Sequence, residues 1–246
     1  MKVSEKGYCM WKMYDALLEQ VQAEDRIELV QAGGHWILVK TEQGAVGVAA
    51  VQTGRSGQLL HPGEYSGMRI SEAAKLVKSW DYEKAALGLA AINAHLNRND
   101  RFPNCGEPDA FLRYRDRARG KKVAVIGRFA YLEERLEPIC ELSVLERKPG
   151  AKEYPDAACE YFLPEMDLVF ITGCTVSNKT LPRLLQLTEK AFTVIAGPST
   201  PMTDALFRFG ADALCGFCVT DEEKCRQAVQ NNSSVFPSGR MVCLEK

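Results

Sequence analysis

The sequence predicts an α/β protein in two parts, a smaller α+β domain followed by a Rossmann-like domain with a parallel sheet. In the first part a helical pattern, three strand-like runs and two further helical patterns follow one another, an order typical of α+β domains. In the second part short, nearly continuous apolar runs alternate with helical patterns. Such runs are typical of parallel strands that are buried on both faces and joined by helical crossovers.

The first part begins with an amphipathic helix in residues 4–22. Its apolar side chains recur at helical spacing: Trp11, Tyr14, Leu17, Leu18 and Val21. Short turns then separate three strand-like runs, which predicts an antiparallel meander: 27–31, 35–40 and 45–51. After a glycine-rich loop, 52–67, two helices are expected at 71–80 and 82–97, with Ser71 and Asp81 as their N-caps.

A change of character separates the two parts. Residues 99–121 are highly charged, contain two prolines and lack a regular period, which predicts a linker between domains spanning 1–98 and 122–246. Beyond the linker the apolar runs predict five strands: 122–127, 141–146, 168–173, 193–197 and 213–219.

Composition excludes several classes of function. The chain has 246 residues, 46% of them hydrophobic, and a formal net charge of −1. A chain so close to neutral is not expected to bind nucleic acid or a membrane surface. No apolar run approaches the roughly 20 residues of a membrane span, and the N-terminus lacks a signal-peptide pattern. Nine scattered cysteines and only three histidines favour reduced thiols in the cytoplasm over disulfides or a zinc site.

The ends of the predicted parallel strands are the expected place for a ligand, because open α/β sheets bind ligands beyond their carboxyl edge. Four loops lie there, and their residues are the candidates for ligand binding. They are Gly127, Arg128 and Phe129 after the first strand, Glu146 after the second, Gly173, Cys174, Thr175 and Asn178 after the third, and Gly197, Pro198 and Ser199 after the fourth.

The first two loops give different indications about nucleotides. Gly127 stands without the G-x-G-x-x-G pattern, so NAD bound in the usual way is not expected. Arg128 is suited to a carboxylate or phosphate, or is a solvated surface side chain. Glu146 follows Gly127 by about 20 residues, the offset at which an acidic residue meets a ribose hydroxyl. Its alternative role is pairing with Arg147 or Lys148.

The stretch "LVFITGCTVSNKTLP" (168–182) is the strongest candidate for a ligand loop. Gly173 permits close approach of a backbone, and amides at a helix start bind anions. Alternatively, Ser177, Asn178 or Thr180 caps the following helix. Cys174 is placed where a helix dipole lowers the pKa of a thiol. Ser199, in the next loop, has no neighbouring histidine in the sequence to activate it as a nucleophile.

Other residues carry weaker signals. Asn93 and Asn97 share one face of an alanine-rich helix, which suggests that the first domain contributes amides to the ligand, although Asn97 also suits a cap. Cys215 and Cys218 have C-x-x-C spacing within a predicted strand, where such positions face opposite sides of the sheet, so they are expected in the core.

Two runs, "KPGAKEYPDAACEYFLPEMDLVFITGCTVSNKTLPRLLQL" and "VIAGPSTPMTDALFRFGADALCG", resemble an uncharacterised family that is named for heavy-metal chelation. Residues 121–240 resemble its Rossmann-like domain, and residues 5–95 resemble its N-terminal partner, which is similar to the N-terminal domain of enolase. The resemblance implies a binding or active site in a cleft between the domains, with a heavy-metal ion or a metal chelate as ligand. Enolase chemistry is not implied, because the catalytic barrel is absent.

Three hypotheses therefore stand. In the first, a cytoplasmic protein binds a small anionic or metal-chelating ligand in the interdomain cleft, with or without enzymatic activity, in a role in heavy-metal chelation. In the second, thiols and carboxylates, with Cys105 and Cys174 foremost, bind a soft metal ion directly. In the third, the protein is a non-catalytic regulatory module. The sequence leaves open any reaction and whether the chain forms a homo-oligomer.

Overall fold

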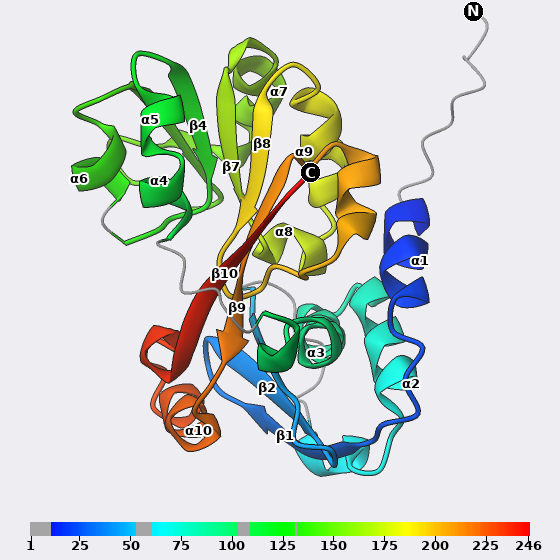
Figure 1. Cartoon of the computed structure of the whole chain (residues 1–246). Coiled ribbons are helices and arrows are strands. Elements are labelled where there is room, and N and C mark those ends of the chain that lie inside the picture. The colour runs from blue at the N-terminus through cyan, green and yellow to red at the C-terminus, as the bar shows by residue number, and fades with distance from the viewer. Residues whose placement is uncertain (1–10, 53–60, 103–108, 131) are drawn as a thin grey trace, which may run out of the picture.

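The structure is a computed structural model that describes residues 11–52, 61–102, 109–130 and 132–246 (Figure 1). The start of the first predicted helix, most of the glycine-rich loop and Cys105 lie outside these ranges.

A seven-stranded, mostly parallel sheet forms the larger half, in the order β10-β9-β8-β7-β4-β5-β6. Its strands are β4 (Lys122–Ile126), β5 (Glu141–Glu146), β6 (Tyr154–Pro155), β7 (Leu168–Thr172), β8 (Phe192–Ala196), β9 (Ala213–Val219) and β10 (Gly239–Glu245). All five predicted strands are present and parallel. The sequence patterns had indicated neither β6 at one edge nor β10, which runs antiparallel to β9 at the other. The predicted α/β class is confirmed.

The central strands are buried on both faces, as their apolar runs predicted. In β4, Ala124 and Ile126 belong to one hydrophobic cluster, whereas Val123 and Val125 belong to the cluster on the opposite face. β9 follows the same alternation, which places the C-x-x-C thiols on opposite sides of the sheet, Cys215 in one cluster and Cys218 in the other. Their prediction as core residues is confirmed.

Helices and short 3₁₀ segments surround this sheet. The helices are α4 (Ala110–Arg113), α5 (Arg115–Ala118), α6 (Leu132–Leu136), α7 (Cys159–Phe162), α8 (Cys174–Ser177), α9 (Leu181–Leu187) and α10 (Glu222–Gln230). The first two fall within the predicted linker. Asp109 caps α4 by accepting hydrogen bonds from the amides of Phe111 and Leu112. Phe111 packs against Phe170 of β7, with ring centroids 4.9 Å apart, so this segment covers one face of the sheet.

The smaller half is the predicted antiparallel meander with its helices. The meander consists of β1 (Ile27–Ala32), β2 (Trp36–Thr41) and β3 (Val46–Ala50), and the helices are α1 (Trp11–Glu19), α2 (Ile70–Ala74) and α3 (Tyr82–Leu96). Asp81 caps α3, as expected, through the amides of Glu83 and Lys84. The expectation for Ser71 is wrong, because α2 begins after Arg69 without a side-chain cap and Ser71 lies inside it.

The two halves interlock. One face of the small sheet packs on α3, and its other face packs on α10, which follows β9 of the large sheet (Figure 1). Leu38 and Val48 join a cluster with Phe217 and Val229 from the larger half. Polar contacts also cross the junction, since the Tyr14 hydroxyl donates to the Val176 carbonyl at 2.9 Å. The main hydrophobic cluster likewise includes residues of both halves.

Candidate functional site

A cavity of about 890 Å³ opens at the carboxyl edge of the large sheet, where β4, β5 and β7 end. β4 has β5 on one side and β7 on the other, so the strand order reverses at this point. Open α/β sheets bind ligands at such a switch point. His35, Val51 and Gln52 of the smaller half complete the wall, and the cavity therefore lies between the halves.

The structure brings about half of the predicted site residues to this cavity. Those that line it are Gly127, Arg128, Glu146, Cys174, Thr175 and Asn178. The remaining candidates lie outside its lining: Asn93, Asn97, Phe129, Gly173, Gly197, Pro198 and Ser199.

Several of the residues outside the cavity have packing roles. A Cβ at Gly173 would lie 2.5 Å from the amide nitrogen of Thr200, so glycine is required there because another loop approaches it. Phe129 packs edge-on against Phe111, with ring centroids 5.1 Å apart. Gly197, Pro198 and Ser199 are buried at the end of β8. These residues shape the turns beneath the cavity.

Asn93 of α3 and Asn97 at its C-terminal end are bonded to backbone rather than facing the cavity. The Asn97 side chain donates to the carbonyls of Thr200 (2.9 Å) and Phe217 (3.3 Å) and accepts from the amide of Met202 (2.9 Å). Asn93 donates to the Val48 carbonyl at 2.9 Å. Both side chains are buried and donate to backbone carbonyls, Asn97 across the junction between the halves and Asn93 to β3 within the smaller half.

Ser199 makes a similar contact. Its hydroxyl accepts the amide of Ala50 at 2.9 Å and lies 3.7 Å from the Cys174 thiol, which donates to it. The free edge of β3 is thus bonded by side chains from two other elements, Asn93 of α3 and Ser199 of the loop after β8.

In the turn from Thr172 to Asn178, side-chain hydroxyl groups hydrogen-bond to backbone carbonyls of the same turn. The Thr175 hydroxyl donates to the Thr172 carbonyl at 2.7 Å, and the Ser177 hydroxyl donates to the Cys174 carbonyl at 2.9 Å. Asn178 accepts from the amide of Thr180 at 3.0 Å, in the turn before α9, and the expected side-chain cap is absent because Thr180 is the N-cap of α9 and no side chain bonds its first amides. Because α8 is only one turn long, its amides do not form an extended anion site.

Arginines at the rim of the cavity are held in place by carboxylates. Arg128 makes a two-point contact with Glu153, with 2.9 Å between Nε and Oε1, and this contact lowers the pKa of Glu153 to about 2. Arg183 pairs with Glu160 in the same way. The exposed side chain of Lys148 makes no ion pair within the described ranges. The rim therefore carries the paired guanidinium groups of Arg128 and Arg183 and the exposed ammonium group of Lys148.

Glu146 lies at the C-terminal end of β5 and lines the larger cavity. Its Oε1 accepts the amide of Arg147 at 2.7 Å and that of Lys148 at 3.4 Å. The Arg147 side chain is directed to another carboxylate, since its guanidinium lies 3.7 Å from Asp156. Within the described residues Glu146 forms no ion pair, so its second oxygen remains available at the cavity.

Lys179 is a cavity residue that the sequence patterns did not indicate. It is 4% exposed, has a left-handed backbone with φ of 69°, and donates to the carbonyls of Ser177 at 2.6 Å and of Ser79 in the smaller half. Burial lowers its pKa to about 8. The local sequence Asn178-Lys179-Thr180 does not indicate this buried, left-handed conformation, because the conformation depends on tertiary packing.

The thiols do not form a metal centre with their neighbours. Cys159 and Cys174 both line the cavity, but burial raises the pKa of Cys159 to about 12, which keeps it protonated. Among the described residues no group of three or more histidines, cysteines and acidic side chains is arranged to hold a metal ion. The described donor set therefore does not fit a bare heavy-metal ion. Cys105 lies outside the described residues.

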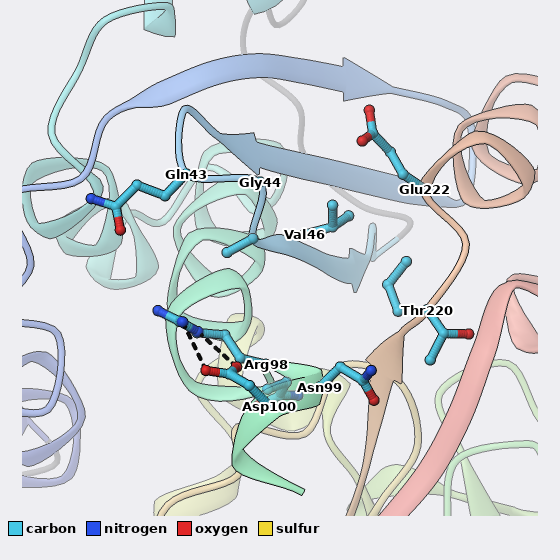
Figure 2. A pocket seen from close by; sticks show the side chains of 11 residues that line it. Gln43, Gly44, Val46, Arg98, Asn99, Asp100, Thr220 and Glu222 are labelled. Carbon is cyan, nitrogen blue, oxygen red and sulfur yellow. Dashed lines mark hydrogen bonds and ion pairs between the residues drawn. The ribbon is translucent and has the colours of Figure 1, made fainter. Parts of the chain in front are cut away.

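A second, smaller cavity of about 360 Å³ lies between the β2–β3 turn, the end of α3 and the end of β9 (Figure 2). Asn97 borders it. Figure 2 shows Arg98 paired with Asp100, which lies 2.8 Å away, and Glu222 is 3.1 Å from Lys40. None of the predicted strand-end residues lines it, so the larger cavity is the better candidate.

Fold and cavity together define a Rossmann-like α/β protein in which a second, antiparallel unit closes the carboxyl edge of the sheet. Two family models match the chain, over residues 14–96 and 109–243, and both are described as "Putative heavy-metal chelation". The chain belongs to this family, as the resemblance had indicated. No helix among the described residues is long and apolar enough to cross a bilayer.

Solved structures of relatives share the whole architecture. A protein of unknown function from the DUF364 family of Desulfitobacterium hafniense is 34% identical, with 96% of this chain and 99% of that chain covered and a TM-score of 0.90. A Pyrococcus horikoshii protein of the same family is 22% identical over 96% and 99% of the two chains, with a TM-score of 0.80, and shows the fold alone. An uncharacterized protein of Methanocaldococcus jannaschii is 31% identical over 162 residues, 63% of this chain and 62% of that protein's length.

Proposed function

We propose that the protein binds a small anionic or metal-chelating molecule in the larger cavity, in the cleft between domains that we assign to residues 1–98 and 122–246. The observation that carries the proposal is the convergence of Gly127, Arg128, Glu146 and Asn178 from three strand ends on one cavity that the other half closes. A cavity of this size, partly apolar and with a few fixed polar groups, is typical of small-molecule sites.

The charges at the rim define the expected chemistry. Arg128 is oriented by Glu153, so its guanidinium can bind a carboxylate or phosphate of the ligand without losing much side-chain freedom. Lys148 adds a second cation nearby. Glu146 accepts a hydroxyl or amine proton of the ligand. Whether a reaction follows binding is not part of the proposal.

A role in heavy-metal chelation is consistent with this site if the metal arrives as a chelate. An organic chelator brings its own donor atoms, so the protein needs only to bind the organic part. Binding of a chelate would explain why the family is described by heavy-metal chelation, although the side chains of the described residues do not fit a bare metal ion. We place the protein in the cytoplasm, which the free thiols of Cys140, Cys159, Cys174, Cys225 and Cys243 support.

Native mass spectrometry of gently purified protein tests the proposal. We expect an additional organic mass that is lost in Arg128→Ala and retained in Arg119→Ala. Arg119 is a matched control, since it is exposed, pairs with Asp116 and precedes β4 at the opposite edge of the sheet. Elemental analysis is run in parallel, and any metal should leave together with the organic mass.

Two results would contradict the proposal. One is a stoichiometric metal ion that survives dialysis with no organic mass, which would favour direct coordination by thiols and carboxylates. The other is protein that carries no ligand and gains no thermal stability from citrate, nucleotides or other multivalent organic anions, which would favour a non-catalytic regulatory module.

A further inference from the structure

We infer that Glu146 binds the vicinal hydroxyls of a ribose, so that the ligand of the larger cavity is a ribonucleotide. This inference rests on the proposed binding function and names the chemical class of its ligand. Three independent features carry it: the position of Glu146 in the sheet, the orientation of its carboxylate, and the surroundings it faces.

The position of Glu146 follows from the parallel register of β4 and β5. Ile126 pairs with Leu145, and the Gly127 amide donates to the Leu145 carbonyl at 2.9 Å. Glu146 therefore stands beside Gly127 at the mouth of the cavity. Gly127 has a φ of 99°, which favours glycine, and a Cβ there would lie 2.8 Å from Cγ2 of Thr172 at the end of β7, so the strand ends pack closely. In Rossmann-like sheets an acidic residue at the end of the second strand meets the ribose.

The carboxylate is held with one oxygen occupied and the other available. Oε1 accepts two consecutive backbone amides, those of Arg147 and Lys148, which hold this oxygen against the backbone. The nearest guanidinium does not neutralise it, because Arg147 lies near Asp156 and over the ring of Tyr82. A partly buried carboxylate without an ion pair in the described ranges is suited to accepting hydroxyl protons, because an ionised acceptor strengthens a hydrogen bond.

The remainder of the cavity suits the other two parts of a nucleotide. Ile126, Leu184 and Leu187 contribute apolar surface against which a flat base can pack, and Arg128 and Lys148 supply positive charge for phosphate. A dinucleotide fits poorly, since the loop after β4 lacks the glycine pattern that admits a pyrophosphate and α6 has only five residues. The same vicinal hydroxyls occur in free sugar phosphates, so the test includes one.

Titration calorimetry on the full-length protein distinguishes these ligands. The probes are the four ribonucleoside 5′-monophosphates, their 2′-deoxy counterparts, ribose 5-phosphate and inorganic phosphate. We expect at least one ribonucleotide to bind about 10-fold or more tightly than its deoxy form, the loss that follows from one hydrogen bond to a charged acceptor. Ribose 5-phosphate and phosphate should bind more weakly still.

Variants connect that preference to one side chain. Glu146→Gln should bring the ratio of ribo to deoxy affinity close to 1 while phosphate binding stays unchanged. Glu141→Gln, an exposed glutamate at the other end of β5, should keep the wild-type ratio. Circular dichroism and thermal unfolding of both variants confirm that the fold is intact before their affinities are compared.

Equal affinity for ribo and deoxy forms, or an unchanged ratio in Glu146→Gln, would overturn the inference. So would ribose 5-phosphate binding as tightly as the best nucleotide, because the base would then contribute nothing. If no nucleotide binds but an organic ligand is still retained in an Arg128-dependent way, the ribose inference fails and the proposed function stands. If no ligand of any kind is found, both fail.

Discussion

Removing the side chain of Asn97 tests whether its predicted ligand role or its observed junction role is the real one. In Asn97→Ala, two buried carbonyls and one buried amide lose their partners. At about 1 kcal/mol for each hydrogen bond the loss is about 3 kcal/mol. This is a large fraction of the 5–15 kcal/mol that stabilises a typical domain. The thermal midpoint should fall by about 9 °C, because about 1 kcal/mol shifts it by about 3 °C in a chain of this size.

A second substitution sharpens the test. Asn97→Asp keeps an oxygen that accepts the Met202 amide but places another oxygen against the carbonyls of Thr200 and Phe217. Repulsion between these oxygens should make this variant less stable than Asn97→Ala, although its side chain is larger. Asn231→Ala is the control, since Asn231 is exposed at the end of α10 and its loss should change stability by no more than about 0.5 kcal/mol.

Urea unfolding followed by tryptophan fluorescence and by circular dichroism measures all three variants. The two probes should give one coincident transition, because a single hydrophobic cluster spans both halves. The reasoning is refuted if Asn97→Ala is as stable as the Asn231 control, or if Asn97→Asp is the more stable of the two Asn97 variants.

Further substitutions test the other assignments. Gly173→Ala should destabilise by about 1–3 kcal/mol, since its Cβ would press on backbone atoms of the next loop, whereas Gly63→Ala, which meets nothing within 4 Å, should be close to neutral by urea unfolding. The lowered pKa of Lys179 means that the unfolded chain binds more protons between pH 8 and 10.5, so wild-type stability relative to Lys179→Met should rise across that window, and a flat difference would contradict it. The lowered pKa of Glu153 gives the same direction in the acid range: its stabilisation is present above pH 4.5 and is lost as the pH falls towards 2, so Glu153→Gln should remove that part of the acid transition.

The parallel strands were predictable because burial on both faces leaves a continuous apolar run in the sequence. β10 was not, although it is as long as β9. It is an edge strand with one residue, Val242, fully buried, and its apolar run, 241–244, is only four residues long. Its pairing with β9 depends on a chain reversal through 231–238 that no local pattern announces. Two-residue β6 leaves even less signal.

The site was predictable to the level of loops but not of side chains. Parallel topology alone brings the ends of β4, β5 and β7 to one edge, so Gly127, Glu146 and Asn178 were expected to lie together. Topology does not say which side of each loop faces the opening. Small polar residues serve a ligand and a junction equally well, and therefore Ser199 and Asn97 looked like ligand residues although the structure bonds them to backbone. Lys179 had no local pattern at all, because its burial arises only when Ser79 approaches.

The junction and the cavity share one structural element, and this links stability to binding. The loop from Thr172 to Lys179 presents Cys174, Thr175 and Asn178 to the cavity, while Val176 and Lys179 bond to the smaller half. A ligand that contacts both walls of the cavity favours the docked arrangement of the halves, because it binds that state and not the unfolded chain. Loss of the Asn97 contacts should consequently weaken ligand binding even though Asn97 lies outside the lining. Binding measured on Asn97→Ala would separate this coupling from a direct role, since added ligand should recover stability with the logarithm of its concentration over its Kd, whereas a variant that lacks a true contact residue would show little recovery.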